Sequence, residues 1–227
     1  SLKFDYFSPD EKNRLSVFAS AANTDRDSYY GPGNDPLKAY GKTTDLTAMG
    51  GAQYVHTFDK CFFMPSDLTA GLEYNRDRLK DNMWGYNRHT DQTVNIYSAF
   101  LQNEWKNDRW GILIGGRLDK HNMVDNVIFS PRANLRFNPT QNINLRLSYS
   151  SGFRAPQAFD EDMHIENVGG TVAMIERAKD LKEEKSQSFS VSADMYHRFG
   201  AFQTNLLIEG FYTRLTDVFV LGKPYDR

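Results

Sequence analysis

Residues Asn142–Arg154 read N-I-N-L-R-L-S-Y-S-S-G-F-R, and this stretch carries the clearest structural signal in the chain. Apolar side chains stand at every second position from Ile143 to Tyr149, with polar side chains between them. Successive residues of a β-strand point to opposite faces, so the pattern predicts a strand with one apolar and one polar face. Residues 188–195 repeat the pattern, with Phe189 and Val191 on one face and serines on the other.

The same pattern, followed outward along the chain, predicts about ten strands. We expect them at residues 2–8, 14–22, 47–58, 67–75, 93–105, 109–119, 128–137, 142–154, 186–197 and 201–218. The connections alternate in length: short ones fall at 9–13, 59–66, 106–108, 138–141 and 198–200, and long ones at 23–46, 76–92, 120–127 and 155–185. If neighbouring strands are antiparallel, every long connection lies on the same rim. This alternation is typical of a barrel that crosses a bilayer, with short periplasmic turns and long extracellular loops. The predicted fold is therefore all-β, an antiparallel up-and-down meander that forms part of a transmembrane β-barrel.

Composition sets limits on the function. The 227 residues carry a net charge of −2 with a pI near 6.2, which argues against a nucleic-acid partner. Mean hydropathy is −0.62, and no apolar run of about 18 residues is present, which excludes a transmembrane helix but not a barrel. The single cysteine, Cys61, has no internal partner for a disulfide and is expected to be an ordinary turn residue.

The predicted polar face is rich in charge, with Arg132, Asn134 and Arg136 on one strand and Asn144 and Arg146 on the next. Unpaired burial of so many charges would be costly, so this face should be wet or covered by polar groups. Aromatic residues gather near the short turns and again near the other strand ends, as two girdles at membrane interfaces would. They are Trp105, Trp110, Phe137, Tyr196, Phe199 and Phe202 at one end, and Tyr149, Phe153 and Tyr212 at the other.

Several motifs resemble TonB-dependent outer-membrane receptors. Ser148–Pro156 is similar to the family's S-x-G-F-R-A-P signature, and residues 180–186 are similar to its L-K-P-E-x-S stretch, with Glu183 in place of the proline. Residues 100–105 resemble the Q-x-E-W strand, and residues 116–119 the G-x-R-x-D strand. Residues 153–170 look most like receptors of the Bacteroidetes type.

The resemblance implies a barrel of about 22 strands with a plugged lumen. It implies energy-coupled import of a scarce nutrient (an iron chelate, cobalamin, another metal complex or a glycan) across the outer membrane of a Gram-negative bacterium. The TonB energy-coupling system would be a partner through the plug, and outer-membrane lipid would surround the wall. No internal domain boundary is visible, so residues 1–227 are interpreted as one segment of the barrel domain, without the plug and the C-terminal strand.

Candidate ligand-binding residues lie in the predicted external loops, where aromatic side chains combine apolar contact with hydrogen bonding. They are Tyr29, Tyr30, Trp84, Tyr86, Arg154, Asp160, Asp162 and His164. Asp160, Asp162, His164 and Glu166 alternate as oxygen and imidazole donors and are weak metal candidates, since they do not fit the EF-hand template. A solvated acidic loop is the plainer interpretation of these residues. Arg154 also has a plainer interpretation than ligand binding, as an ion-pair partner of Asp160, Glu161 or a lipid phosphate. Residues 175–184 are expected to form a short helix inside the last long loop.

No catalytic residues and no cofactor are expected, because the sequence lacks G-x-S-x-G, Walker, C-x-x-C and H-E-x-x-H motifs. Two function classes stay open: part of an energy-coupled receptor, or a self-contained passive barrel that acts as a porin or adhesin. An outer-membrane hydrolase would need a Ser/His pair in register, and the serines at 190 and 192 have no such histidine. An isolated open sheet would also have two free edges, so self-association through them is a further expectation.

Overall fold

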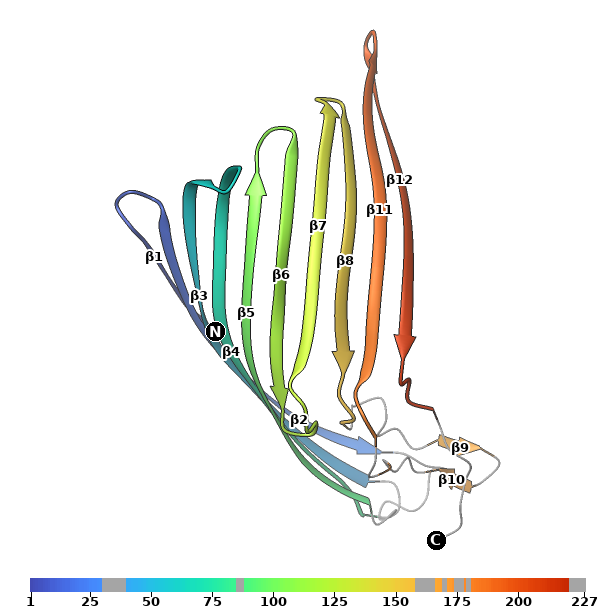
Figure 1. The fold of residues 1–227 in the computed structure, drawn as a ribbon. Coiled ribbons are helices and arrows are strands. Elements are labelled where there is room, and N and C mark those ends of the chain that lie inside the picture. Colours follow the sequence, from blue (N-terminus) through green and yellow to red (C-terminus); the bar gives the residue numbers. More distant parts are fainter. Residues whose placement is uncertain are drawn as a thin grey trace.

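The computed structural model describes residues 1–29, 40–84, 88–157, 166–168, 171–173, 178 and 181–220, with only the backbone described in the two three-residue segments. Ten strands form one antiparallel sheet in the order β1-β2-β3-β4-β5-β6-β7-β8-β11-β12, and β9 and β10 form a separate small hairpin (Figure 1). The strands are β1 (Leu2–Phe7), β2 (Asn13–Tyr29), β3 (Tyr40–Cys61), β4 (Met64–Met83), β5 (Arg88–Lys106), β6 (Trp110–His121), β7 (Ile128–Thr140), β8 (Ile143–Arg154), β9 (Glu166–Val168), β10 (Thr171–Ala173), β11 (Glu184–Phe199) and β12 (Phe202–Thr216). The described residues contain no helix long and apolar enough to cross a membrane.

The meander predicted from the sequence is confirmed. Each strand of the large sheet pairs with its neighbours in chain order, and β8 pairs with β11 across the segment that holds the small hairpin. In Figure 1 the tight turns lie together at the top of the sheet, and the strand ends that lead into the longer connections lie at the bottom. The sheet is open in this chain, with β1 and β12 at its edges.

The four strand ends that flank the first two long connections were predicted too short by five to eight residues. β2 continues to Tyr29 and β3 begins at Tyr40, so most of the loop predicted at 23–46 is strand. β4 continues to Met83 and β5 begins at Arg88, so most of the loop predicted at 76–92 is strand too. Polar side chains occupy both faces here, so the apolar-polar alternation disappears although the backbone ladder continues. The β3–β4 turn shrinks to residues 62 and 63. The helix expected at 175–184 is not found in the part of that range that is described: residues 178 and 181–183 have no regular secondary structure and Glu184 begins β11, while residues 175–177 and 179–180 lie outside the described residues.

The two faces of the sheet differ as predicted. The pairing register places Leu147 between Leu135 and Val191 on one face, and Ser148 between Asn134 and Ser190 on the other. Large side chains on the first face are widely exposed, including Leu72, Leu101, Ile114, Phe129 and Val191. Few apolar side chains are buried among the described residues: Val124, Ile128 and Ala155 form a cluster with Phe153 packed against it, and Leu79, Met83 and Val94 are buried elsewhere. A sheet that leaves its apolar face uncovered is suited to lipid rather than water on that side. We call this the outer face and the polar one the inner face.

Aromatic pairs mark two levels on the strands. Near the short turns, the Trp110 ring stacks on Phe137 with centroids 4.2 Å apart, and the Phe63 and Trp105 ring centroids are 5.7 Å apart. Nearer the long loops, the Tyr74 and Tyr97 ring centroids are 4.9 Å apart. Trp105 lies eight positions after Tyr97 on β5, about 26 Å along the strand at the usual rise. For a strand tilted by about 40° this is about 20 Å along the membrane normal, somewhat less than the band about 25 Å tall that two aromatic girdles flank in transmembrane barrels.

Candidate ligand-binding rim

The strands β2 to β5 continue well past the Tyr74–Tyr97 pair on the long-loop side. On β4, Asp81 lies seven positions beyond Tyr74, about 23 Å along the strand. We call residues 23–29, 40–48, 76–83 and 88–93 the strand extensions. They carry the loop-side end of the sheet, where the predicted ligand-binding residues of the first half of the chain lie.

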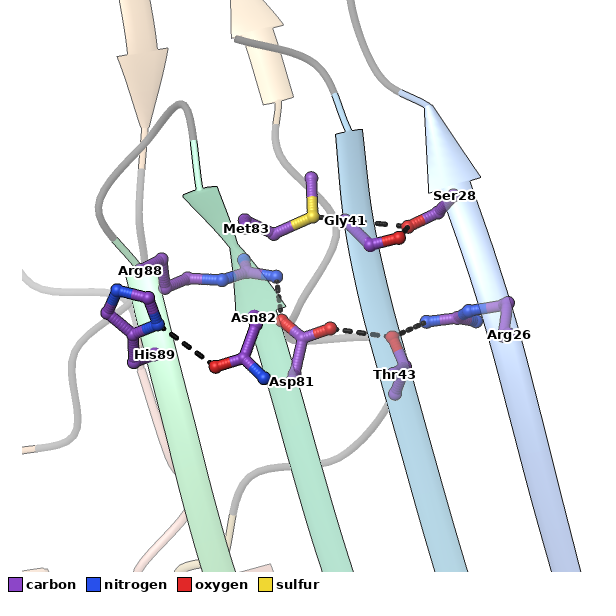
Figure 2. Close-up of polar contacts among 9 residues, drawn as sticks. All are labelled: Arg26, Ser28, Gly41, Thr43, Asp81, Asn82, Met83, Arg88 and His89. Carbon is purple, nitrogen blue, oxygen red and sulfur yellow. Dashed lines mark hydrogen bonds and ion pairs between the residues drawn. The ribbon is translucent and has the colours of Figure 1, made fainter. Parts of the chain in front are cut away.

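Asp81 is the centre of a buried polar cluster on the inner face of these extensions (Figure 2). Thr43 Oγ1 on β3 donates to one carboxylate oxygen at 2.6 Å, and Arg88 Nη2 on β5 donates to the other at 2.6 Å. The side chains of Asp81 and Arg88 are only 2% and 14% exposed. Arg26 Nη2 on β2 donates to Thr43 Oγ1 at 3.4 Å, so the cluster joins four adjacent strands.

Close packing accompanies this cluster. Met83 is 1% exposed and lies against Gly41, where an added Cβ would fall 1.8 Å from Met83 Sδ. Ser28 Oγ donates to the Gly41 carbonyl at 3.4 Å and approaches Met83 Sδ at 3.9 Å. Only glycine allows β3 and β4 to keep this contact, since any larger residue must displace a buried methionine.

Two predicted ligand-binding residues, Tyr29 and Trp84, come together at the tip of the extensions. Tyr29 pairs with Tyr40 across β2 and β3, and the Tyr40 ring stacks on Trp84 with centroids 5.3 Å apart and planes 9° apart. The three rings are between two fifths and one half exposed. Tyr40 Oη donates to Asp27 at 3.0 Å, and this bond raises the pKa of the Tyr40 hydroxyl, which stays a neutral donor. The tip therefore offers apolar ring faces next to polar groups.

Arg154 lies elsewhere, at the loop-side end of β8. Its guanidinium is 3.9 Å from Glu184 and stands 5.8 Å from the centroid of the Phe219 ring. The side chain is about half exposed. The described structure does not bring Arg154 together with Tyr29, at the end of β2, or with Trp84, which directly follows β4; three strands, β5 to β7, lie between β4 and β8 in the sheet.

The remaining candidates are not described. Tyr30, Tyr86, Asp160, Asp162 and His164 lie outside the described residues, and Glu166 opens β9 without a described side chain. Among the residues whose side chains are described, no group of three His, Cys, Asp or Glu could hold a metal ion. The loop metal site therefore stays a prediction.

The inner face carries ion pairs below the rim as well. Arg117 contacts Glu73 at 2.6 Å and Asp119 at 2.8 Å, and Ser98 donates to Asp119 at 2.6 Å. Nearer the short turns, Arg136 and Arg146 line an open hollow together with Glu104 and Asn134. Much of this face is paired charge, which agrees with the prediction that it is wet or covered by polar groups.

Sequence reasoning missed the rim cluster of Arg26, Thr43, Asp81 and Arg88. These residues fall in the segments interpreted as loops, where no regular pattern singles out one charge among many. One signal was present: Leu79, Asp81 and Met83 stand at alternate positions, which places the carboxylate between two apolar residues on one face of a strand.

The family described as "TonB dependent receptor-like, beta-barrel" matches residues 1–225 of the chain. No curated protein sequence gives a significant match. Solved structures do: the siderophore receptor PirA from Acinetobacter baumannii has a TM-score of 0.64 at 16% identity, over 94% of this chain and 41% of that one. PirA from Pseudomonas aeruginosa has a TM-score of 0.58 at 12% identity, over 89% and 40%.

FpvA from P. aeruginosa, solved with heterologous pyoverdines, has a TM-score of 0.62 at 12% identity, over 93% of this chain and 32% of that one. The chain thus spans well under half the length of each of these three receptors. At such identities the likeness concerns the fold.

Proposed function

The chain belongs to the TonB-dependent receptor-like β-barrel family, and from this premise we propose that it is part of the wall of an energy-coupled outer-membrane receptor. The complete protein would lie in the outer membrane of a Gram-negative bacterium and import a scarce nutrient. TonB would supply the energy through a plug domain, and this chain would form one segment of the surrounding barrel.

The observation that carries the proposal is the division of the sheet into levels. An exposed apolar band lies between two aromatic levels on the outer face, the inner face is polar, and all long connections lie at one end. A bilayer requires this order of surfaces from a barrel wall, whereas a protein in water has no reason to expose one whole apolar face. The family match supports an energy-coupled receptor over the passive porin or adhesin.

For the substrate we propose a metal chelate, with an iron–siderophore complex as the first candidate. The structural similarity to PirA, a siderophore receptor, and to FpvA, which was solved with bound pyoverdines, supports this choice. The stacked Tyr40 and Trp84 rings, with Tyr29 beside them, offer flat surfaces for an organic chelate. Tyr30, Tyr86, Asp160, Asp162 and His164 in the predicted loops, and Arg154 at the end of β8, are proposed to contribute as well, in a receptor of the Bacteroidetes type.

The test is uptake by cells that lack the gene and carry it back on a plasmid. We expect growth under iron limitation to need the complete protein, and uptake of a radiolabelled ferric chelate to stop when the energy-coupling system is deleted. Replacement of Tyr40 and Trp84 by alanine should lower the affinity for the chelate by about tenfold or more, because two stacked aromatic surfaces are lost.

The matched control replaces Phe62 and Phe63, two exposed aromatic residues in the short β3–β4 turn at the opposite rim, and should leave uptake unchanged. Uptake that persists without the energy-coupling system would reject the receptor in favour of the passive barrel. Energy-dependent uptake of cobalamin or a glycan, but not of an iron chelate, would keep the receptor and reject the substrate.

A further inference from the structure

A row of three cations lies on the outer face of β4, directly beyond the apolar band. Arg76, Arg78 and Lys80 occupy alternate positions of the strand, so their side chains leave the sheet on the same face as Leu72 and Tyr74. The side chains of Arg78 and Lys80 are 42% and 46% exposed, and Arg76 is exposed as well. We call these three residues the basic row.

The outer face changes its chemistry in a fixed order along β4. Leu72 is 65% exposed, and Leu101 on the neighbouring strand β5 is 56% exposed. Tyr74 follows, paired with Tyr97, and its hydroxyl donates to Asn95 at 2.7 Å. The basic row comes next. This order of hydrocarbon, aromatic ring and cation is the order in which a membrane-spanning surface meets acyl chains, the interface and the headgroups.

The row has an excess of positive charge. Asp91 on β5 is its nearest carboxylate, 3.9 Å from Arg78 Nη2 and 3.5 Å from Lys80 Nζ. Three cations and one carboxylate give +2 on this patch. The facing β3 positions Thr44, Leu46 and Ala48 are uncharged. Asp25 and Asp27 belong to β2, one strand further away, and accept hydrogen bonds from Thr44 and Tyr40.

Arg78 has a donor without a partner. Its Nε is buried and makes no hydrogen bond to any described residue, although Asp91 lies close to Nη2. A buried donor of this kind is costly unless an acceptor reaches it. A phosphate has three oxygens that match the guanidinium fork.

The distance of the basic row from the aromatic level favours a glycolipid over an ordinary phospholipid. Its residues lie two, four and six positions beyond Tyr74, which is about 5 to 15 Å along the membrane normal for strands tilted by about 40°. The polar layer of an ordinary phospholipid leaflet is about 5 to 8 Å thick and covers only the first of them. A glycolipid that carries phosphates on its sugars extends further.

We propose that the basic row binds the phosphate groups of a glycolipid in the outer leaflet, which makes it a lipid-binding site on the outer face of the barrel, between the apolar band and the Tyr40–Trp84 tip. This inference rests on the proposed outer-membrane location. Arg76 and Arg78 contact the phosphates nearest the acyl chains, and Lys80 contacts a more distant anionic group. Long basic side chains can bend toward these groups while their alkyl stems stay on the strand.

The experiment uses the complete receptor, purified from outer membranes, stripped of lipid and titrated with a bisphosphorylated glycolipid in native mass spectrometry. Replacement of all three cations (R76Q, R78Q and K80Q) should weaken binding by about tenfold or more, since each cation near an anionic lipid adds to the attraction. Asp91→Asn should strengthen binding, because it removes the competing carboxylate. The matched control removes three cations at the short-turn end (K60Q, R109Q and R198Q) and should bind like the unaltered protein.

Three results would overturn the proposal: equal binding by the basic-row variant, equal binding of the dephosphorylated glycolipid, or equal binding of phosphatidylglycerol. A row that takes up inorganic phosphate but not the glycolipid would reject it as well. Fractionation and uptake are measured on the same variants. Loss of glycolipid binding with outer-membrane location and uptake intact supports this site, whereas absence of the unaltered protein from the outer membrane rejects the proposed function instead.

Discussion

Replacement of Asp81 by asparagine should loosen the loop-side end of the sheet while the membrane-spanning part stays folded. The carboxylate accepts hydrogen bonds from Thr43 and Arg88 and is almost fully buried. Asparagine keeps the size and one acceptor oxygen but removes the charge that balances Arg88. The Arg88 side chain is 14% exposed, and its Nε already lacks a partner among the described residues, so water cannot readily replace the carboxylate.

The size of the effect follows from the burial. Removal of one partner from a buried ion pair costs about 3 to 5 kcal/mol. We expect about 3 kcal/mol here, because the cluster lies near the end of the sheet and can rearrange toward water. An exposed pair is worth at most about 1 kcal/mol, and Asp91, 59% exposed beside Arg78 and Lys80, is such a case.

Hydrogen exchange in the complete receptor separates the two parts of the sheet. Local opening sets the exchange rate of each amide, and about 3 kcal/mol corresponds to roughly 150-fold faster exchange. We expect this acceleration at residues 80–83 and 88–91 in the D81N protein, with no change at residues 68–72. The D91N protein should change by less than about fivefold at the same amides.

A double variant tests the cause. D81N combined with Arg88→Met removes the unbalanced charge together with its partner, so exchange should return part of the way toward that of the unaltered protein. The single variant R88M is measured as well. The charge argument is wrong if D81N and D91N accelerate exchange equally. It is also wrong if the free energy lost in the double variant exceeds the sum of the losses in D81N and R88M.

Two further predictions concern the faces of the sheet and its packing. Ile208 and Leu207 are neighbours on β12 with 57% and 58% exposure, but they pair with Ala193 on the outer face and Asp194 on the inner face. Ile208→Arg should lower the unfolding free energy in lipid vesicles by about 2 to 4 kcal/mol, and Leu207→Arg by less than about 1 kcal/mol; equal losses would mean that the assigned faces are wrong. Gly41→Ala should cost about 1 to 3 kcal/mol in a urea titration, because its Cβ would fall 1.8 Å from Met83 Sδ. Gly210→Ala, whose Cβ meets nothing nearer than 3.7 Å, is the control and should stay within about 0.5 kcal/mol.

The parts of the strands that face lipid on one side could be predicted from the sequence. The parts of the same strands that extend beyond the lipid could not. Between Ile143 and Tyr149 the bilayer requires apolar residues on the outer face, which leaves a period of two in the sequence. Beyond Tyr74 both faces meet water or headgroups, so Arg76, Arg78 and Lys80 follow one another on the outer face without any apolar marker. Strand pairing alone maintains the structure there, and backbone hydrogen bonds leave little trace in side-chain type.

The candidate site shows the same division: residue positions could be predicted from the sequence, but contacts between strands could not. Tyr29 and Trp84 were predicted as loop aromatics, and they do lie at the loop-side end, although Tyr29 belongs to a strand. Their contact through Tyr40 depends on how far β2 and β3 stay paired, which the local sequence does not specify. Asp81 was missed because its role requires Thr43 and Arg88 from two other strands. The register in which β3, β4 and β5 pair cannot be derived from the residues of β4 alone.

The strand extensions have a consequence for what can reach this protein from outside the cell. Four paired strands lift the Tyr40–Trp84 tip far above the level of the Tyr74–Tyr97 pair. Sugar chains crowded on a bacterial surface exclude antibodies and phage from anything close to the lipid. Trp84 lies ten positions beyond Tyr74, so we expect the tip to be more accessible to antibodies and surface-targeted reagents than the apolar band or the basic row.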